Sequence, residues 1–305
     1  MFAHLLIPLD GTKMAESALP VAVSIAGKCG SRLTLVHIIE RNAPERIHGE
    51  RHLTDAGEAG AYLRSRMEGL SPLGAGIGMH VHETEEGNVA RSLVEHAQEL
   101  GVDLIVMCTH GHKRLDQVLF GTIAQQVIAL GETPVLTLHP EVSPHRPAAD
   151  WRSALVPLDG DPSHEQSIPV ASELGRSCDF SLHLLVSVPT YASLSGTQAT
   201  RSRFAPAATS ELLEMAEEDA SEYLKRHVER LQELGREVTG EVARGDPAAA
   251  ITDAARRLKI DLIVMGTHGR VGTSAFWSGS VAPAVFNRSR LPVLLVPLER
   301  PGGFR

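Results

Sequence analysis

The sequence predicts an α/β protein built from two tandem, open, five-stranded parallel sheets with helices on both faces, a Rossmann-like architecture. One observation is that the chain repeats itself at long period, which indicates two copies of one folded unit. The other is that each copy alternates short apolar, β-branched runs with longer helical patterns, as βαβ units do. Right-handed crossovers between five such strands give an open, doubly wound sheet.

The repeat is visible by direct comparison of the two halves. Residues 6–11 (LIPLDG) match residues 155–160 (LVPLDG) at an offset of 149. Residues 103–107 and 261–265 are both DLIVM, at an offset of 158. The second copy therefore carries about nine extra residues (158 minus 149), as expected for an insertion in a surface loop.

The repeat divides the chain into two domains of ordinary size. A proline-rich stretch between the copies, HPEVSPHRPAA at residues 139–149, is typical of a semi-extended linker. We expect a first domain at residues 1–140, a linker at 141–150 and a second domain at 151–300.

Each copy is expected to contain five strands and four helices in alternation. The predicted strands are residues 3–9, 32–39, 78–83, 103–108 and 134–138, then 152–158, 181–188, 236–243, 261–265 and 292–296. The predicted helices are residues 14–28, 54–70, 88–100 and 122–130, then 163–176, 210–234, 247–258 and 280–287.

The strongest helical pattern lies at residues 210–234. An apolar stripe runs from Leu212 to Val228 with acidic and basic residues between its members, so this helix is predicted to cover one face of a sheet. Residues 189–209 precede it, are rich in Ser, Thr, Ala and Pro and show no period. They are predicted to be a loop that holds most of the extra length of the second copy.

Composition excludes several classes of function. With 43% hydrophobic and 22% charged residues the chain has the composition of a globular protein, and no apolar run reaches the ~18 residues that span a bilayer. A net charge of −8 without a basic stripe argues against nucleic acid as a partner. The start lacks a signal peptide and the three cysteines lack metal or disulfide spacing, so a cytoplasmic location is expected.

Ligands of open parallel sheets bind beyond the carboxyl ends of the strands, where strand order reverses. The first strand of each copy ends at a carboxylate, Asp10 or Asp159. Such a carboxylate can bind a ribose hydroxyl or a phosphate-bound Mg²⁺. It can equally cap the turn that follows, and the residue alone does not decide between these roles.

The fourth strand of the second copy is followed by two glycine clusters, at residues 266–272 and at Gly279-Ser280. Glycine lets backbone approach a ligand closely. The second cluster opens a helix, where free amide groups and the helix dipole favour an anion. Together with the aspartate at the end of the first strand, these clusters indicate a phosphate site rather than plain turns.

The pattern G-x2-G-x9-G-S, filled by residues 266, 269, 279 and 280, resembles the ATP-binding loop of the universal stress protein family. The resemblance covers essentially the whole chain as a tandem pair, including a G-D-P helix start at residues 245–247. It implies an adenine nucleotide alpha hydrolase-like fold that binds ATP, with Mg²⁺ left open, and a site formed by Pro157, Leu158, Asp159, Val186, Gly266, His268, Gly269, Gly279, Ser280 and Val281. The end of the second strand, at residues 186–188, would offer adenine a backbone edge.

The first copy departs from this pattern. It retains Asp10, Gly111, Gly121 and Thr122 at the matching positions, but Cys108 replaces the first glycine. Arg114 also stands where the second copy has Gly272, and it could pair with a phosphate instead. We therefore expect the second copy to bind ATP, and the first to bind it weakly or not at all.

Other motifs carry weaker signals. His80 and His82 alternate onto one face of a strand and could chelate a metal, but no third ligand is evident, so no metal site is expected. The glycines at 74–78 precede a strand, which favours a turn over a dinucleotide fingerprint. Cys108 is expected to be a packing residue.

The resemblance implies an ATP-binding, stress-linked regulatory protein. An enzyme is not expected, because no general base is paired with a nucleophile and no catalytic residue is evident. The alternatives are a slow ATPase or nucleotidyl-transfer enzyme of a related fold, and a scaffold that binds no nucleotide. Members of the family pair through their last strands, so residues 135–138 and 293–296 are expected to associate within the chain as a pseudo-dimer, and homo-oligomers are possible. AMP and cyclic AMP stay open beside ATP because all present adenosine.

Overall fold

The computed structural model describes residues 2–43, 46–47, 50–70, 76–109, 122–139, 147–194, 200, 204–267 and 281–298. The first repeat contains β1 (His4–Pro8), α1 (Lys13–Glu16), α2 (Leu19–Cys29), β2 (Arg32–Glu40), β3 (Arg46–Ile47), β4 (Glu50–Arg51), α3 (Ala56–Leu70), β5 (Ile77–Glu86), α4 (Val89–Glu99), β6 (Leu104–Cys108), α5 (Thr122–Leu130) and β7 (Val135–Leu138).

The second repeat begins after a short 3-10 turn, η2 (Ala148–Asp150). It contains β8 (Ser153–Leu158), η3 (Pro162–His164), α6 (Ser167–Cys178), β9 (Ser181–Val188), α8 (Pro206–Glu233), β10 (Val238–Arg244), α9 (Pro247–Arg257), β11 (Leu262–Thr267), α11 (Val281–Ser289) and β12 (Val293–Pro297).

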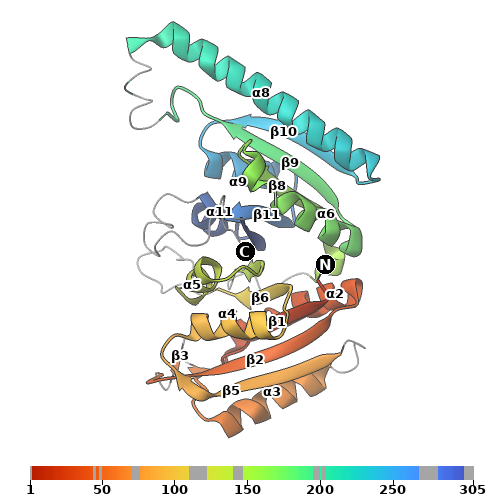
Figure 1. The fold of residues 1–305 in the computed structure, drawn as a ribbon, viewed down its shortest axis with the longest axis vertical. Coiled ribbons are helices and arrows are strands. Elements are labelled where there is room, and N and C mark those ends of the chain that lie inside the picture. Colours follow the sequence, from red (N-terminus) through yellow and green to blue (C-terminus); the bar gives the residue numbers. More distant parts are fainter. Residues whose placement is uncertain are drawn as a thin grey trace.

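The two predicted five-stranded sheets are present, and they join into one ten-stranded sheet that runs the length of the molecule (Figure 1). The strand order is β10-β9-β8-β11-β12-β7-β6-β1-β2-β5. Strands β7 and β12 pair antiparallel at the centre, and every other neighbouring pair in this sheet is parallel. The expected association of the two last strands within the chain is thus confirmed.

Helices cover both faces of the sheet, as predicted. Helices α2, α3, α6 and α8 contribute to one hydrophobic core and α4, α5, α9 and α11 to the other. Alternate residues of the central strands enter the two cores: Leu5 and Ile7 face the first and Leu6 the second. Because both faces are buried, these strands are continuously apolar, which is the pattern of parallel sheets.

Two helices that were expected to be continuous are interrupted near their beginning. The predicted helix at 14–28 is divided into α1 and α2, and Pro20 lies in the first turn of α2. The predicted helix at 163–176 is likewise divided into η3 and α6. A proline ring fits only the first turn of a helix, because further along it would clash with the preceding turn.

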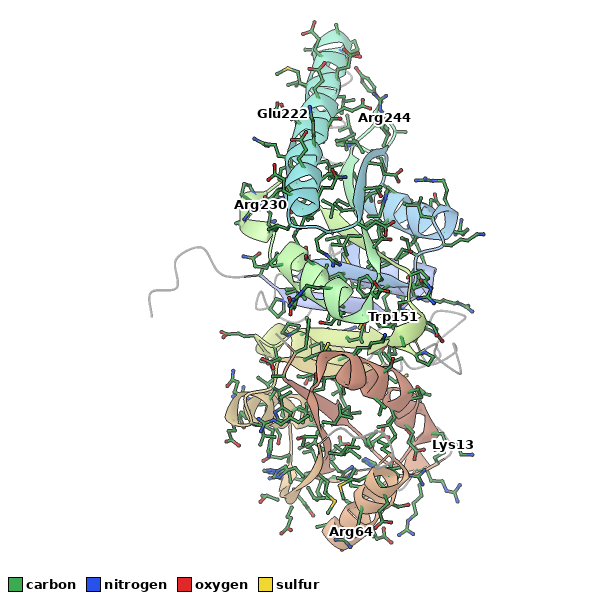
Figure 2. The ribbon with its side chains drawn as sticks, turned by 90° about the vertical axis from the view of Figure 1, so that its right-hand side faces the viewer. Lys13, Arg64, Trp151, Glu222, Arg230 and Arg244 are labelled. Atoms are coloured by element: carbon green, nitrogen blue, oxygen red, sulfur yellow. The ribbon has the colours of Figure 1, made fainter. Side chains whose placement is uncertain are left out.

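Helix α8 begins at Pro206, four residues before its predicted start, and only part of it covers the sheet. Its buried residues Ala220, Tyr223 and Leu224 lie in the second half, whereas Leu212 and Met215 are 65% and 57% exposed. The first half projects beyond the end of the sheet, at the top of Figure 2. The prediction that this helix covers one face of a sheet therefore holds for its second half.

Among the residues that the structure describes, no helix is both long enough and apolar enough to cross a membrane.

Candidate functional site

The strand order reverses between β8 and β11 in the second repeat. Their ladder ends at Leu155 and Ile263, whereas β8 stays paired with β9 as far as Leu158, and β11 stays paired with β12 as far as Thr267. The first repeat shows the same early end of pairing between β1 and β6. In doubly wound sheets this is the topological switch point, where ligands bind.

Asp159 follows β8 at this point and holds the turn after the strand. Its Oδ1 accepts a hydrogen bond from the backbone N–H of Asp161 at 3.0 Å, and its Oδ2 lies 2.5 Å from His164 Nδ1. Its side chain is nevertheless 58% exposed. The turn-capping role weighed for this residue is real, and the exposed carboxylate also faces solvent where a ligand can reach it.

Two neighbours of Asp159 were missed in the sequence. His164 sits in η3, five residues after Asp159, and one turn of 3-10 helix brings the two together. Asp161 is a second carboxylate close by, but its Oδ1 accepts from both the N–H and the hydroxyl of Ser163 and so caps η3. The D-G-D-P-S-H run at residues 159–164 carries the signal for both, because Asp before Pro is a helix-start signature.

Asp10, the counterpart of Asp159, is similarly engaged. Its Oδ1 accepts hydrogen bonds from both the backbone N–H and the hydroxyl of Thr12, at 2.9 and 2.7 Å. Thr12 in turn caps α1 through Ala15 N–H. This carboxylate therefore stabilises the turn into α1.

The next residue of each turn distinguishes the repeats. Gly11 and Gly160 both have positive φ, +93° and +83°. A Cβ placed on Gly11 would lie 2.9 Å from Leu53 Cγ, whereas one placed on Gly160 would meet no atom of the described residues within 4 Å. The strand end of the first repeat is thus covered by protein, and that of the second is open with respect to the described part of the chain.

The cover on the first repeat is the segment from Glu50 to Leu53, which includes β4 and was not anticipated. Glu50 accepts a hydrogen bond from the N–H of Lys13 at 2.7 Å. The buried ring of His37 links both sides of the contact: its Nδ1 lies 2.6 Å from the carbonyl oxygen of Leu9, and its Nε2 lies 3.0 Å from that of Leu53. We call residues 50–53 the cover segment.

Gly266 and Cys108 occupy equivalent positions near the ends of β11 and β6. A Cβ on Gly266 would lie 2.7 Å from Leu298 Cδ2, so this position has no room for a side chain unless Leu298 moves. Cys108 is buried, and burial raises the pKa of its thiol to about 11. Its expected role as a packing residue agrees with this burial.

The other described residues of the predicted site lie around the same strand ends. Leu158 is buried beside Val186 in the β8–β9 ladder, and Pro157 pairs with Leu185. Strand β9 is flanked by β8 and β10, and the carbonyl oxygen of Val188 accepts the N–H of Gly245 at 2.9 Å. Pairing of β9 with β8 ends at Val186 and its pairing with β10 ends at Val188, so the role of this strand end in binding adenine stays a prediction.

Val281 and Thr122 are the first residues of α11 and α5, so each stands at the amino end of a nine-residue helix. The remaining residues of the predicted site lie outside the described residues: His268, Gly269, Gly279, Ser280, Gly111 and Gly121. One further polar group borders the site, because the hydroxyl of Thr267 is buried without a hydrogen-bond partner among the described residues. Such groups in native proteins are usually satisfied by a partner, water or ligand.

A third potential metal ligand, which was not evident in the sequence, lies beside His80 and His82. His96 of α4 lies against both rings, with ring centroids 4.6 Å from His80 and 5.0 Å from His82. The sequence held one indication that His96 faces the sheet. It lies three residues after the buried Leu93 and thus near the stripe of α4 that packs on the sheet.

The family model described as "Universal stress protein family" matches residues 1–139 and again residues 151–297. A universal stress protein of Methanocaldococcus jannaschii is 39% identical over 83 residues, which cover 27% of this chain and 49% of that relative. One from Mycolicibacterium smegmatis is 24% identical over 314 residues, covering 96% of both chains.

Among solved structures, a universal stress protein from Archaeoglobus fulgidus aligns with 97% of this chain and 99% of its own length. The TM-score is 0.71 at 16% sequence identity. The likeness extends over both repeats, so the tandem fold is shared.

Proposed function

This chain belongs to the universal stress protein family, and on that premise we propose that its second repeat binds an adenine nucleotide, with ATP as the expected ligand. The bound nucleotide would act as a regulatory signal in a stress response, and the first repeat would bind it weakly or not at all. We expect the nucleotide to lie between the turn at Asp159 and the glycine motif that begins at Gly266.

The observation that carries this proposal is the difference between Gly11 and Gly160. The cover segment packs Leu53 onto Gly11, while no described residue other than its chain neighbours lies within 4 Å of the corresponding point on Gly160. Glycine at positive φ leaves the backbone accessible, and a ligand can use that access only where protein does not already fill it. The asymmetry supports a site in the second repeat and none in the first.

Two further features support the same assignment. Gly266 has no side chain at the end of β11, where Leu298 packs against it, whereas Cys108 brings a buried side chain to the equivalent point. The helix that starts at Val281 directs its amino end, with its positive dipole, to the end of the glycine motif, where a phosphate group would be stabilised. Asp159 would contact the ribose or an accompanying Mg²⁺ through its exposed carboxylate.

The rival functions are an enzyme and a scaffold that binds no nucleotide. For an enzyme the candidate groups are Asp159 and His164, whose side chains are in contact. Asp159 and His164 both help to hold the turn, and Asp161 caps η3. We therefore propose that the second repeat binds the nucleotide without appreciable turnover. A scaffold would leave the open strand end of the second repeat without a ligand.

Isothermal titration calorimetry with ATP, AMP and cyclic AMP, each with and without Mg²⁺, tests the proposal. We expect one site per chain. Gly266→Cys gives the second repeat the side chain found in the first, and it should weaken binding at least tenfold because the new side chain meets Leu298. Cys108→Gly is the matched control and should leave the affinity unchanged.

Phosphate release from ATP, measured on the same samples, separates binding from turnover. Release that saturates at one equivalent or stays at background supports a regulatory site. Sustained turnover that is lost in His164→Ala would favour the ATPase, and absence of binding by all three nucleotides would favour the scaffold.

A further inference from the structure

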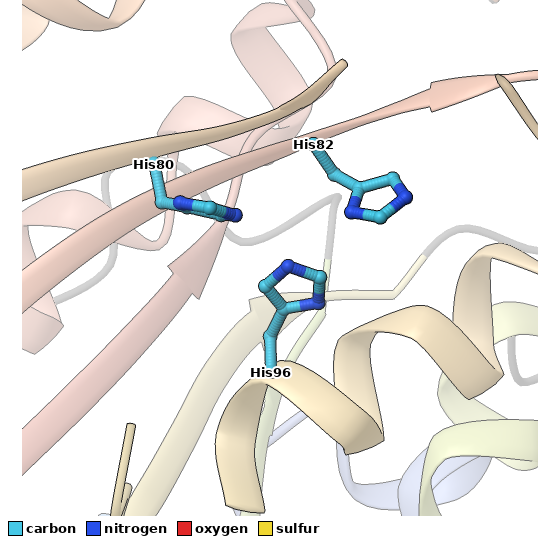
Figure 3. A group of neighbouring side chains, drawn as sticks. All are labelled: His80, His82 and His96. Atoms are coloured by element: carbon cyan, nitrogen blue, oxygen red, sulfur yellow. The ribbon is translucent and has the colours of Figure 1, made fainter. Parts of the chain in front are cut away.

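Three histidines from two elements form a compact cluster at one end of the sheet. His80 and His82 lie on β5 and His96 lies on α4, and Figure 3 shows the three rings around a common space. One ring nitrogen from each residue lies within 4.8 Å of the others. In a tetrahedral zinc site with Zn–N distances of about 2.0–2.1 Å the nitrogens are about 3.3–3.4 Å apart, so small side-chain rotations would close this cluster onto an ion.

The hydrogen bonds of His96 leave one nitrogen free to bind a metal. Its Nδ1 lies 2.7 Å from the carbonyl oxygen of Ser92, one turn earlier in α4. A carbonyl oxygen only accepts, so Nδ1 carries the proton, and in the neutral ring Nε2 then has an exposed lone pair. The residue is buried, at 8% exposed, and its ring points toward His80 and His82 (Figure 3).

His82 is held in the complementary way. Its Nε2 lies 3.0 Å from Glu86 Oε1 on the same strand. The carboxylate accepts the Nε2–H bond, which leaves Nδ1 of the neutral ring as the lone-pair nitrogen. A carboxylate bonded to the far nitrogen of a histidine is the usual support of a metal-binding imidazole, because it fixes the ring and raises its basicity.

His80 supplies an independent sign that a partner is missing. Its Nε2 is buried and has no hydrogen-bond partner among the described residues. A buried polar nitrogen without a partner is costly unless water or an ion satisfies it.

We propose that His80, His82 and His96 bind one divalent transition-metal ion of the zinc class. Three neutral imidazoles suit Zn²⁺, with a fourth position left for water or another ligand. The ion would tie β5, the outermost strand of the first repeat, to α4, whose His96 lies against His80 and His82. This site is separate from the nucleotide site and does not depend on the proposed function.

The second repeat serves as an internal comparison. Val36 and Ile38 of β2 correspond to Leu185 and Ser187 of β9 at the offset of 149, so the strand registers set His80 against Glu241 and His82 against Ala243. His96 corresponds to Ala254 at the offset of 158. The second repeat therefore builds the same strand and helix without these ligands, so the cluster is not required by the fold.

Equilibrium dialysis of tag-free protein against Zn²⁺, with metal measured by mass spectrometry, tests the site. We expect one Zn²⁺ per chain and a raised melting temperature with the metal, and Co²⁺ should give the visible spectrum of a tetrahedral site. His82→Gln and His96→Gln should each weaken Zn²⁺ binding at least 100-fold. His183→Gln removes a histidine of the second repeat and should not change it.

Glu86→Ala keeps all three ligands and removes only the carboxylate that orients His82. We expect it to weaken Zn²⁺ binding about 10–100-fold, in line with other supports of metal-binding histidines. This variant also keeps the proposal testable if a substitution at the buried His96 prevents folding. Wild-type binding no tighter than that of His82→Gln, or binding lost equally in His183→Gln, would overturn the proposal.

Discussion

Leu136 of β7 lies directly opposite Leu294 of β12 in the antiparallel pair at the centre of the sheet. The two residues are equivalent in the repeats, since 294 minus 136 is the repeat offset of 158. An approximate two-fold axis therefore passes between them, and the chain pairs with itself as two copies of a dimer would. Neither last strand is left as an exposed edge, which removes a site of aggregation.

The antiparallel pair of β7 and β12 includes a side-chain hydrogen bond that has no equivalent in the other repeat. The buried hydroxyl of Thr137 donates to the carbonyl oxygen of Val293 at 2.9 Å, whereas the residue equivalent to Thr137 is Leu295. Thr137→Val keeps the shape and should lower the free energy of unfolding by about 1 kcal/mol, the usual contribution of such a bond. Urea denaturation measures it, and an unchanged midpoint would show that this bond adds nothing to the pair.

The three cysteines should differ in reactivity. Cys29 and Cys178 end the equivalent helices α2 and α6, and a hydrogen bond from the Cys178 thiol lowers the pKa of Cys29 to about 7 and raises that of Cys178. Burial raises the pKa of Cys108 to about 11. Because the thiolate is the reactive form, a thiol reagent at pH 7.5 should modify Cys29 first.

Peptide mapping by mass spectrometry identifies the modified residue. Cys108 and Cys178 should become accessible only on unfolding, and Cys29→Ser should abolish the fast phase. Faster modification of Cys108 than of Cys29 would contradict the burial of the β6 end.

Lowering the pH should lower the free energy of unfolding through protonation of His4. This ring is buried, at 3% exposed, between Thr34 Oγ1 and the carbonyl oxygen of Leu100, and burial lowers its pKa. Its folded pKa lies below the unfolded value of about 6.5, so the unfolded chain binds more protons in that window. The contribution of His4 is complete above about pH 6.5 and is lost as the pH falls through the lowered folded pKa.

Urea midpoints between pH 7.5 and pH 5, taken with a chelator present, test this. His4→Gln should flatten the decline of stability with falling pH. Burial lowers the pKa of His183 as well, so the double variant with His183→Gln should be flatter still. A decline of equal slope in all three proteins would exclude these groups as its cause.

The cover segment predicts that the first repeat cannot be repaired by one substitution. Cys108→Gly restores the glycine of the motif, but Leu53 still lies against Gly11. We therefore expect calorimetry on Cys108→Gly to give the same single nucleotide site as the wild type. A second site of similar affinity in that variant would mean that Cys108 alone closes the first repeat.

The alternation of strands and helices could be predicted from sequence because the central strands are buried on both faces and form continuous apolar runs, while the helices between them have a clear helical period. The breaks near the start of the predicted helices at 14–28 and 163–176 could not, because a proline marks a helix start only once its turn is known. The first half of α8 misled the prediction for a different reason. Its apolar spacing is helical, but whether the sheet extends beneath Leu212 depends on the length of β9 and β10.

For the site, the aspartates and Gly266 were found because strand ends and glycine spacing are local signals. The contacts made by Leu53 and His96 were not found, because each joins segments whose approach is set by tertiary packing. The cover segment is short, charged and without a period, and the position of His96 near the buried stripe of α4 does not say which strand it meets. Only the fold brings them to Gly11 and to His80.

A crystal structure of the chain soaked with MgATP tests the nucleotide assignment most directly. We predict nucleotide density in the second repeat, between the Asp159 turn and Gly266, and none at Gly11, where Leu53 occupies the space. Nucleotide bound at Gly11 instead, or a second repeat without nucleotide at millimolar MgATP, would contradict the assignment.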